Sequence, residues 1–150
     1  MSSVTLEIES SVRNVSLMAV AIHAIVAYAG LDPEKSNSVE LALVEAVTNS
    51  IRHAYHGEPN HRVTVVIECE HRRIRFDLID TGVPMPKEKV ERLIRGRGIT
   101  DADYRDLSAI PEGGRGLEII HRTMDEISYK REGVRNHLTL TSYLGTDSLT

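Results

Sequence analysis

The chain has 150 residues, enough for one domain with a substantial buried core. Its hydrophobic fraction of 41% and charged fraction of 27% are ordinary for a soluble globular protein, and a net charge of −4 argues against direct binding of nucleic acid. Cys69 is the only cysteine, which excludes an intramolecular disulfide. With no visible secretion signal and no apolar run long enough to span a bilayer, we predict a cytoplasmic protein that binds no membrane.

A strand and an apolar helix are predicted at the start of the chain. Residues 4–8 alternate between apolar and polar side chains, which is the pattern of a half-buried strand. A helix capped by Asn14 or Ser16 is expected to continue to about Ala29, with Gly30 in the left-handed position that ends many helices. Because this helix is apolar on nearly every side, it is either enclosed in the core or part of a protein contact.

An amphipathic helix is expected next, starting at Asp32 and Pro33 and continuing through Val39–Tyr55. The residues at core-facing spacings are Val39, Leu43, Ala46, Val47, Ser50 and Ala54. The residues that share the opposite face, at intervals of four, three and four, are Glu45, Asn49, Arg52 and His56. This face is either ordinary solvated surface or a site in which Asn49 binds a hard cation and Glu45 accepts a proton.

Two strands joined by a short turn are predicted over Arg62–Cys69 and Ile74–Ile79. The second strand runs directly into Asp80, Thr81 and Gly82. An aspartate followed closely by glycine is common in turns. The same arrangement lets one carboxylate face a cleft while a backbone without a Cβ atom comes close to a ligand.

The segment from Val83 to Glu112 differs in character from the rest of the chain. It is rich in glycine, proline and charged residues, and its few apolar side chains suggest one short helix around Leu93. A loop-like segment of this length inside a compact domain is usually functional or disordered. We therefore predict a mobile lid at about residues 83–112.

A glycine-rich segment at residues 113–116 leads into a helix predicted from about Leu117 to Asp125. Glycines at a helix start let backbone N–H groups and the positive end of the helix dipole approach a phosphate, although such starts also occur without an anion. Arg115 is either a phosphate contact or a solvent-facing side chain. Strands over Ile127–Arg131 and Leu138–Leu144 are expected to close the chain as a hairpin.

Three short motifs occur in a fixed order, and the predicted lid separates the second from the third. They are Glu45-Ala-Val-Thr-Asn49, Asp80-Thr-Gly82 and Gly114-Arg-Gly116-Leu117. In this order the chain resembles the Bergerat-fold (GHKL, histidine-kinase-like) ATPases, the superfamily of gyrase and histidine kinases. Within it, EAVTNSIRHAY and TMDEISY are most similar to the bacterial anti-sigma factor serine kinases, which act in partner-switching pathways. The resemblance covers roughly Val4 to Leu144.

The resemblance implies a role for each matched residue. Asn49 would bind the Mg²⁺ that bridges the ATP phosphates, and Glu45 would be the general base for a substrate hydroxyl. Asp80 would accept a hydrogen bond from the adenine amino group, and Gly82 would let the base lie close. Nucleotide contacts at the start of the last helix would come from Gly114, Arg115, Gly116 and Leu117.

The resemblance also implies partners. Family members phosphorylate a serine of a STAS-domain anti-anti-sigma protein, hold a sigma factor inactive and often form homodimers. The sequence departs from the family pattern at one place. Many relatives have a Gly-Thr pair entering the final strand, with the threonine near the phosphates, whereas this chain has Asn136 and His137 there. Two other nucleotide folds are excluded, because neither a P-loop motif nor a dinucleotide-binding glycine motif is present.

The predicted fold class is α+β, a two-layer α/β sandwich in which three helices cover one face of a mixed, mostly antiparallel sheet. The predicted function is an ATP- and Mg²⁺-dependent protein-serine kinase that acts as an anti-sigma-type regulator. The Asn136-His137 pair leaves open a nucleotide-gated binding module without phosphotransfer. The apolar first helix leaves open a plain interaction domain with no nucleotide affinity.

Overall fold

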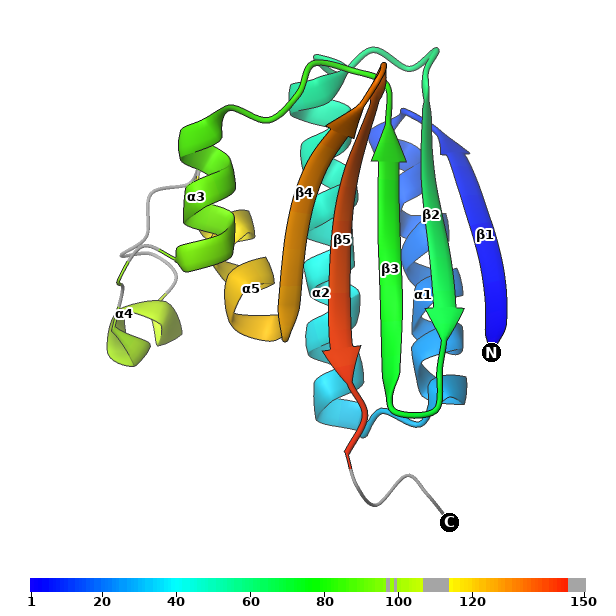
Figure 1. Cartoon of the computed structure of the whole chain (residues 1–150), viewed down its shortest axis with the longest axis vertical. Coiled ribbons are helices and arrows are strands. Elements are labelled where there is room, and N and C mark those ends of the chain that lie inside the picture. The colour runs from blue at the N-terminus through cyan, green and yellow to red at the C-terminus, as the bar shows by residue number, and fades with distance from the viewer. Residues whose placement is uncertain (97, 99, 107–113, 146–150) are drawn as a thin grey trace.

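The computed structural model describes residues 1–96, 98, 100–106 and 114–145, with only the backbone given at 103 and 104. One layer is a five-stranded sheet in the order β1-β2-β3-β5-β4 (Figure 1). Its strands are β1 (Ser2–Glu9), β2 (Arg62–Cys69), β3 (Arg73–Asp80), β4 (Glu126–Glu132) and β5 (Arg135–Tyr143). Every pair of neighbouring strands is antiparallel, so the sheet is antiparallel throughout rather than mixed.

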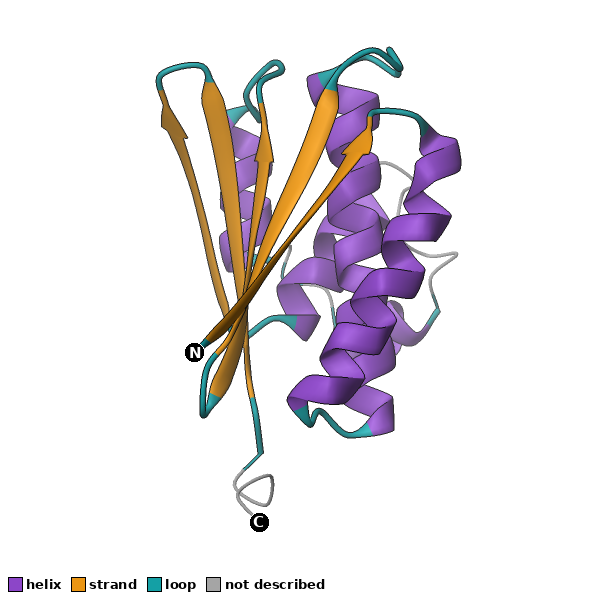
Figure 2. Ribbon diagram, turned by 90° about the vertical axis from the view of Figure 1, so that its right-hand side faces the viewer, coloured by secondary structure: helices purple, strands orange, loops and turns teal. Residues whose placement is uncertain are grey.

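The second layer consists of helices packed against one face of this sheet. The longer helices are α1 (Val15–Ala29), which follows the 3-10 turn η1 (Val12–Asn14), and α2 (Pro33–Asn49), which continues as the π-helical turn η2 (Ser50–Ala54). The shorter ones are α3 (Lys87–Arg95), α4 (Asp101–Arg105) and α5 (Arg115–Thr123). Figure 2 shows α1 and α2 side by side along the sheet. The predicted two-layer α+β sandwich is confirmed.

One apolar cluster joins the two layers. Strands β2 and β3 bury alternate side chains, as the period of a strand with one covered face requires. Phe76, the single phenylalanine, is fully buried on β3. The predicted core-facing residues of the second helix are all buried, so its amphipathic pattern is confirmed. Tyr55 is also buried in this cluster, whose other members among the described residues are aliphatic side chains and methionines.

Helix α1 begins and ends close to the predicted positions, and Gly30 has the expected left-handed φ of 94°. Its inner face buries Val15, Met18, Ile22 and Val26. By length and a mean hydropathy of 1.5, the segment Val12–Ala29 is apolar enough to cross a membrane, but its inner face is part of the domain core. The same composition leaves the outward face of α1 apolar and exposed.

The start of α2 follows from local chemistry. The Asp32 side chain accepts a hydrogen bond from Lys35 N at 2.9 Å, and Pro33 occupies the first helical position. An N-cap carboxylate of this kind satisfies a backbone donor that the helix itself leaves free, and proline there loses no hydrogen bond. These two residues fix where the helix begins.

The end of this helix departs from the predicted α-helical spacing. At η2 the Tyr55 N–H donates to Ser50 O at 3.2 Å, five residues back, which is the hydrogen bond of a π-helix. A π turn holds more residues than an α turn, so it rotates the side chains that follow. The sequence predicted that Arg52 shares a face with Asn49. In the structure, His53 lines a cavity together with Asn49, and Arg52 does not.

Two further expectations are corrected by the structure. Strand β5 begins at Arg135 rather than Leu138, so Asn136 lies inside the sheet and not before it. The predicted lid contains two helices rather than one, because α4 lies within it in addition to α3, which confirms the short helix expected around Leu93. Leu93 of α3 is fully buried, and its carbonyl is 3.1 Å from His121 Nδ1 of α5. Residues 97, 99 and 107–113 of the predicted lid lie outside the described residues.

Candidate functional site

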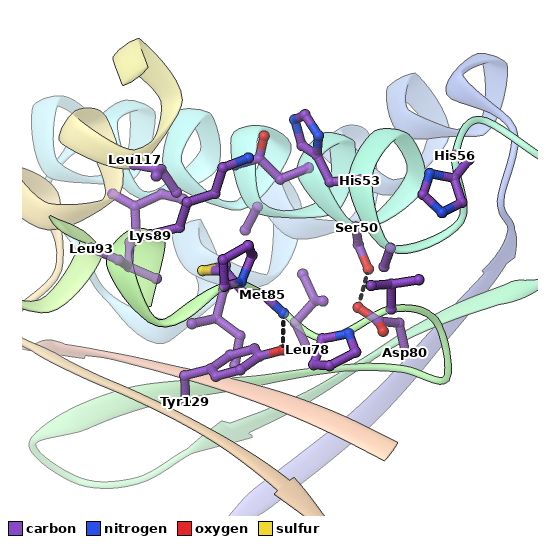
Figure 3. Close-up of a pocket in the computed structure, with 18 residues that line it drawn as sticks. Ser50, His53, His56, Leu78, Asp80, Met85, Lys89, Leu93, Leu117 and Tyr129 are labelled. Atoms are coloured by element: carbon purple, nitrogen blue, oxygen red, sulfur yellow. Dashed lines mark hydrogen bonds between the residues drawn. The ribbon is translucent and has the colours of Figure 1, made fainter. Parts of the chain in front are cut away.

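A cavity of about 260 Å³ opens between the two layers, near the end of β3 (Figure 3). Its walls come from α2, η2, α3, α5 and the segment that follows β3. Among the residues that line it are Asn49, Ser50, His53, His56, Asp80, Met85, Lys89, Leu117 and Tyr129. Small-molecule sites typically measure roughly 300–1,000 Å³, so this cavity can hold part of a nucleotide-sized ligand.

Asp80 is the buried polar group at one end of the cavity. The residue is 8% exposed and lies at the last position of β3. Oδ2 accepts a hydrogen bond from Ser50 Oγ at 2.5 Å, and Oδ1 accepts from Asn136 Nδ2 at 2.7 Å and from Gly82 N at 3.1 Å. A carboxylate held by three donors is a fixed acceptor for a ligand.

Gly82 lets the turn after β3 touch the π-helical turn. A Cβ atom at Gly82 would lie 2.2 Å from Ala54 O, and the next residue, Val83, donates its N–H to the same carbonyl at 2.9 Å. No residue with a side chain fits against that backbone. The structure therefore gives Gly82 a role in shaping the cavity wall, in addition to the predicted close approach of a base, which stays a prediction.

Positive and polar side chains line the opposite wall. Asn49 and His53 project from α2 and η2, and Lys89 comes from α3. Burial lowers the pKa of His53, and the nearby positive charges of Lys89 and Arg52 lower it further. Sequence reasoning missed His53 because it assumed α-helical spacing, and it missed Lys89 because that residue belongs to the predicted lid. Together these side chains favour an anionic group.

Glu45 does not line the cavity. It lies on α2, one turn before Asn49, and its side chain is next to the start of α5. A Cβ atom on Gly116 would lie 2.5 Å from Glu45 Oε2, so the carboxylate occupies the space that glycine leaves. Gly114 precedes α5, Arg115 is its first residue, and Leu117 lines the cavity. The fold thus brings the three sequence motifs together: the first touches the third, and all three contribute to the cavity or its border.

Tyr129 forms another part of the cavity wall and was not predicted as a site residue. It comes from β4, and its hydroxyl oxygen accepts a hydrogen bond from Met85 N at 2.7 Å (Figure 3). Burial raises the pKa of the Tyr129 phenol, so the hydroxyl stays protonated at neutral pH. The contact anchors the segment between β3 and α3, which is the first part of the predicted lid.

The protein groups around the cavity can hold a magnesium ion only together with a bound ligand that supplies further metal-binding atoms. No cluster of three or more His, Cys, Asp or Glu side chains able to hold a metal occurs among the described residues. Asn49 offers one carboxamide oxygen at the cavity wall. Mg²⁺ is commonly bound by one or two protein oxygens together with substrate phosphates, and Asn49 suits that arrangement.

The arrangement therefore suits a ligand with two unlike ends. A flat, largely apolar ring that carries an amino group can lie among the apolar side chains and donate to Asp80. An anionic group can lie toward Asn49, Lys89 and the start of α5, where backbone donors and the helix dipole favour negative charge. A nucleotide that carries a 6-aminopurine base has both features.

The chain belongs to the family described as the histidine kinase-like ATPase domain, whose model matches residues 8–142. Among its relatives is the serine-protein kinase RsbW of Listeria innocua, 28% identical over 142 residues that cover 94% of this chain and 87% of the relative. RsbW of Staphylococcus aureus is 28% identical over 143 residues, which cover 94% of this chain and 86% of the relative. These matches confirm the predicted family and the predicted class, a kinase-like ATPase domain related to serine-protein kinases.

Solved structures confirm the fold independently. A chain of the SiaB–SiaC complex from Pseudomonas aeruginosa superposes with a TM-score of 0.58 at 16% identity, covering 94% of this chain and 89% of that one. The catalytic domain of the histidine kinase ThkA superposes with a TM-score of 0.53 at 12% identity and covers 99% of both chains. At these identities the likeness concerns the fold alone.

Proposed function

We propose that this protein is an ATP-dependent protein-serine kinase, and that the cavity beside Asp80 binds the nucleotide. The observation that carries the proposal is the buried carboxylate of Asp80, held by three donors at one end of an apolar cavity whose opposite wall carries Asn49 and Lys89. The adenine amino group would donate to Asp80. The phosphates would extend toward Asn49 and the start of α5, with contacts from Gly114, Arg115, Gly116 and Leu117.

Magnesium is part of this proposal. Asn49 would supply a carboxamide oxygen to the ion, and the phosphates would supply the remaining anionic ligands. Phosphoryl transfer depends mainly on positioning and charge neutralisation, and the cationic wall formed with Lys89 supports both. When bound, the ion would neutralise charge on the phosphates.

Glu45 is the proposed general base. It lies one turn before Asn49 and against Gly116, so its carboxylate borders the place where the phosphates would lie. From there it would accept the proton of a serine hydroxyl while the hydroxyl oxygen bonds to the γ-phosphorus and ADP leaves. The carboxylate is half-buried, which keeps it within reach of a partner protein at the surface.

The proposed substrate is a serine of a STAS-domain anti-anti-sigma protein in a partner-switching pathway in the cytoplasm. Support comes from the serine-protein kinase relatives and from the fold shared with a chain of the SiaB–SiaC complex. The resemblance to anti-sigma kinases makes a sigma factor the proposed second partner. A nucleotide-gated binding module without phosphotransfer is the rival proposal, favoured by the Asn136-His137 pair where many relatives have Gly-Thr.

The substrate proposal is tested by incubating the protein with Mg²⁺-ATP and a STAS-domain protein from the same organism. We expect one phosphoserine on the STAS protein, identified by mass spectrometry, and none when Mg²⁺ is replaced by EDTA. ATP-dependent capture of the STAS protein without a phosphoserine would instead establish the binding module. Neither phosphorylation nor capture would contradict the proposed substrate class.

A homodimer is proposed through the outward face of α1. Leu17, Val20 and Tyr28 lie on this face at helical spacings and are 68%, 69% and 83% exposed. No Asp, Glu, Lys or Arg occurs between Arg13 and Asp32. Two copies can therefore pack these faces together without burying like charges, and contiguous exposed apolar surface commonly marks a protein interface.

Replacing Val20 with Glu is expected to convert the dimer to a monomer, because it would bury a carboxylate against the apolar face of the second copy. Sedimentation or light scattering measures the mass directly. The matched control is Val134→Glu, since Val134 is 66% exposed in the turn between β4 and β5, and this variant should keep the wild-type mass. A wild-type monomer at high micromolar concentration would refute the dimer.

A further inference from the structure

A row of three side chains crosses the sheet beside the cavity. Asp80 on β3, Asn136 on β5 and Arg131 on β4 are directly opposite one another in the strand register. Asn136 lies in the middle and is 2% exposed, whereas Arg131 is exposed. The row joins the buried acceptor of the proposed nucleotide site to the protein surface through one amide.

The partners of Asn136 determine the orientation of its amide. Nδ2 donates to Asp80 Oδ1 at 2.7 Å and to Gly82 O at 3.0 Å, while Oδ1 accepts from Arg131 Nη1 at 3.1 Å. A carboxylate and a carbonyl can only accept, and a guanidinium can only donate. The reversed amide would therefore present the wrong group to all three partners, so each hydrogen bond requires the others.

The network also distinguishes the two oxygens of Asp80. Oδ1 accepts from Asn136 Nδ2 and from Gly82 N, whereas Oδ2 accepts from Ser50 Oγ alone. A carboxylate oxygen can accept two hydrogen bonds, so Oδ2 keeps capacity for one more donor. Since Asp80 and Ser50 both line the cavity, that donor can come from a ligand.

Arg131 is itself held in place. Its Nε donates to Gly133 O at 3.1 Å, within the turn between β4 and β5, while Nη1 reaches Asn136. Asn136 Oδ1 faces the guanidinium, and Asn136 does not line the cavity, so this oxygen is not offered to a ligand there. The site consequently presents an acceptor, Asp80, without a competing amide acceptor beside it.

We propose that Asn136, oriented by Arg131, is a positioning residue that sets the base preference of the site. It holds Asp80 so that Oδ2 accepts from the amino group of a 6-aminopurine. A purine without that group leaves the buried carboxylate short of a partner, and a 6-oxopurine places an acceptor against it. This inference rests on the proposed nucleotide site and specifies how that site recognises its base.

The test compares the dissociation constants of two Mg²⁺ nucleotides by calorimetry, ATP and purine riboside 5′-triphosphate, which lacks the 6-amino group. The variants are Asn136→Leu, which removes all three hydrogen bonds; Asn136→Thr, which keeps one donor; and Arg131→Gln. The matched control is Arg135→Gln, because Arg135 is exposed on the same hairpin and its described contacts include neither Asn136 nor Gly82. Circular dichroism verifies that each variant is folded.

We expect the wild type and Arg135→Gln to prefer ATP by roughly 10- to 100-fold, as for a hydrogen bond to a charged group. The preference should fall to within about threefold in Asn136→Leu, decrease in Arg131→Gln and persist in part in Asn136→Thr. A merely structural role would weaken both nucleotides equally and leave the ratio unchanged.

Two negative results separate the inference from the proposed function. ATP binding with the same preference in every folded variant would overturn the role of Asn136 and leave the nucleotide site intact. A wild type that binds neither nucleotide would overturn the proposed function and this inference with it. If Asn136→Leu does not fold, Arg131→Gln and Asn136→Thr decide, because the first changes an exposed side chain and the second keeps a donor.

Discussion

The Asp80→Asn variant is expected to lose the thermal stabilisation that Mg²⁺-ATP gives the wild-type protein. A ligand at a hundred times its dissociation constant stabilises the folded state by about 2.7 kcal/mol. For a chain of this length that corresponds to a rise of roughly 5–10 °C in the unfolding midpoint. Melting curves with and without Mg²⁺-ATP, recorded for both proteins, measure the difference.

The loss of ATP-dependent stabilisation is expected because the surrounding hydrogen bonds would hold the new amide with its NH₂ group, and not its oxygen, toward the base. Gly82 N and Asn136 Nδ2 both donate toward the Oδ1 position, so the amide oxygen of the new side chain would turn to them. Its NH₂ group would then occupy the Oδ2 position and meet the adenine amino group, donor against donor. The substitution thus converts an acceptor to a donor at the point of recognition.

The matched control for this variant is Asp77→Asn. Asp77 lies on the same strand three residues earlier, so it is on the open face of the sheet, where it pairs with His137 at 3.0 Å. This variant should keep the full ATP-dependent shift. A normal ATP-dependent shift of the unfolding midpoint in Asp80→Asn would show that Asp80 does not recognise the base. If the wild type showed no shift, the interaction domain without nucleotide affinity would become the favoured hypothesis.

The second large effect is expected at Glu45. Replacing it with Gln should slow phosphoryl transfer to the STAS protein by at least about 100-fold, since a positioned general base contributes roughly 10²–10⁴-fold. The nucleotide dissociation constant should stay within about threefold of the wild type, because Glu45 borders the cavity without lining it. Single-turnover phosphoserine formation and calorimetry measure the two quantities separately.

Glu40→Gln is the matched control for the change at Glu45. Glu40 lies on the same helix, five residues earlier, and its carboxylate is 2.6 Å from His23 Nδ1 on α1. Transfer should continue at the wild-type rate in this variant. Undiminished transfer in Glu45→Gln would show that another group accepts the proton or that the reaction needs no base.

Much of the architecture is determined by local sequence. Alternating apolar residues predicted the strands, and Asp32, Pro33 and Gly30 marked helix ends, because strand period, caps and left-handed glycines depend on neighbours in the chain. The apolar stripe of α2 also predicted its buried face. These signals, with the order of the three motifs, were enough to predict the fold and to name Asn49 and Asp80 as site residues.

Long-range contacts decided what local patterns could not. Because of the π-helical turn η2, the side chain beside the cavity is His53 and not Arg52, which α-helical spacing had predicted. A regular helical pattern in the sequence does not reveal a turn of different width. Its last residue, Ala54, touches Gly82 after β3, a contact between segments that lie far apart in the sequence.

The final hairpin, β4 and β5, shows most clearly what local sequence predicts and what only the tertiary structure decides. The sequence by itself determined that two strands end the chain, but the register between them is a property of the whole sheet. That register placed Asn136 opposite both Asp80 and Arg131. It also brought Tyr129 to Met85, 44 residues away. Sequence chemistry therefore supplied the buried acceptor and its glycine, while only the tertiary structure decided which side chains hold the acceptor in place, because those partners are brought together by strand pairing and packing.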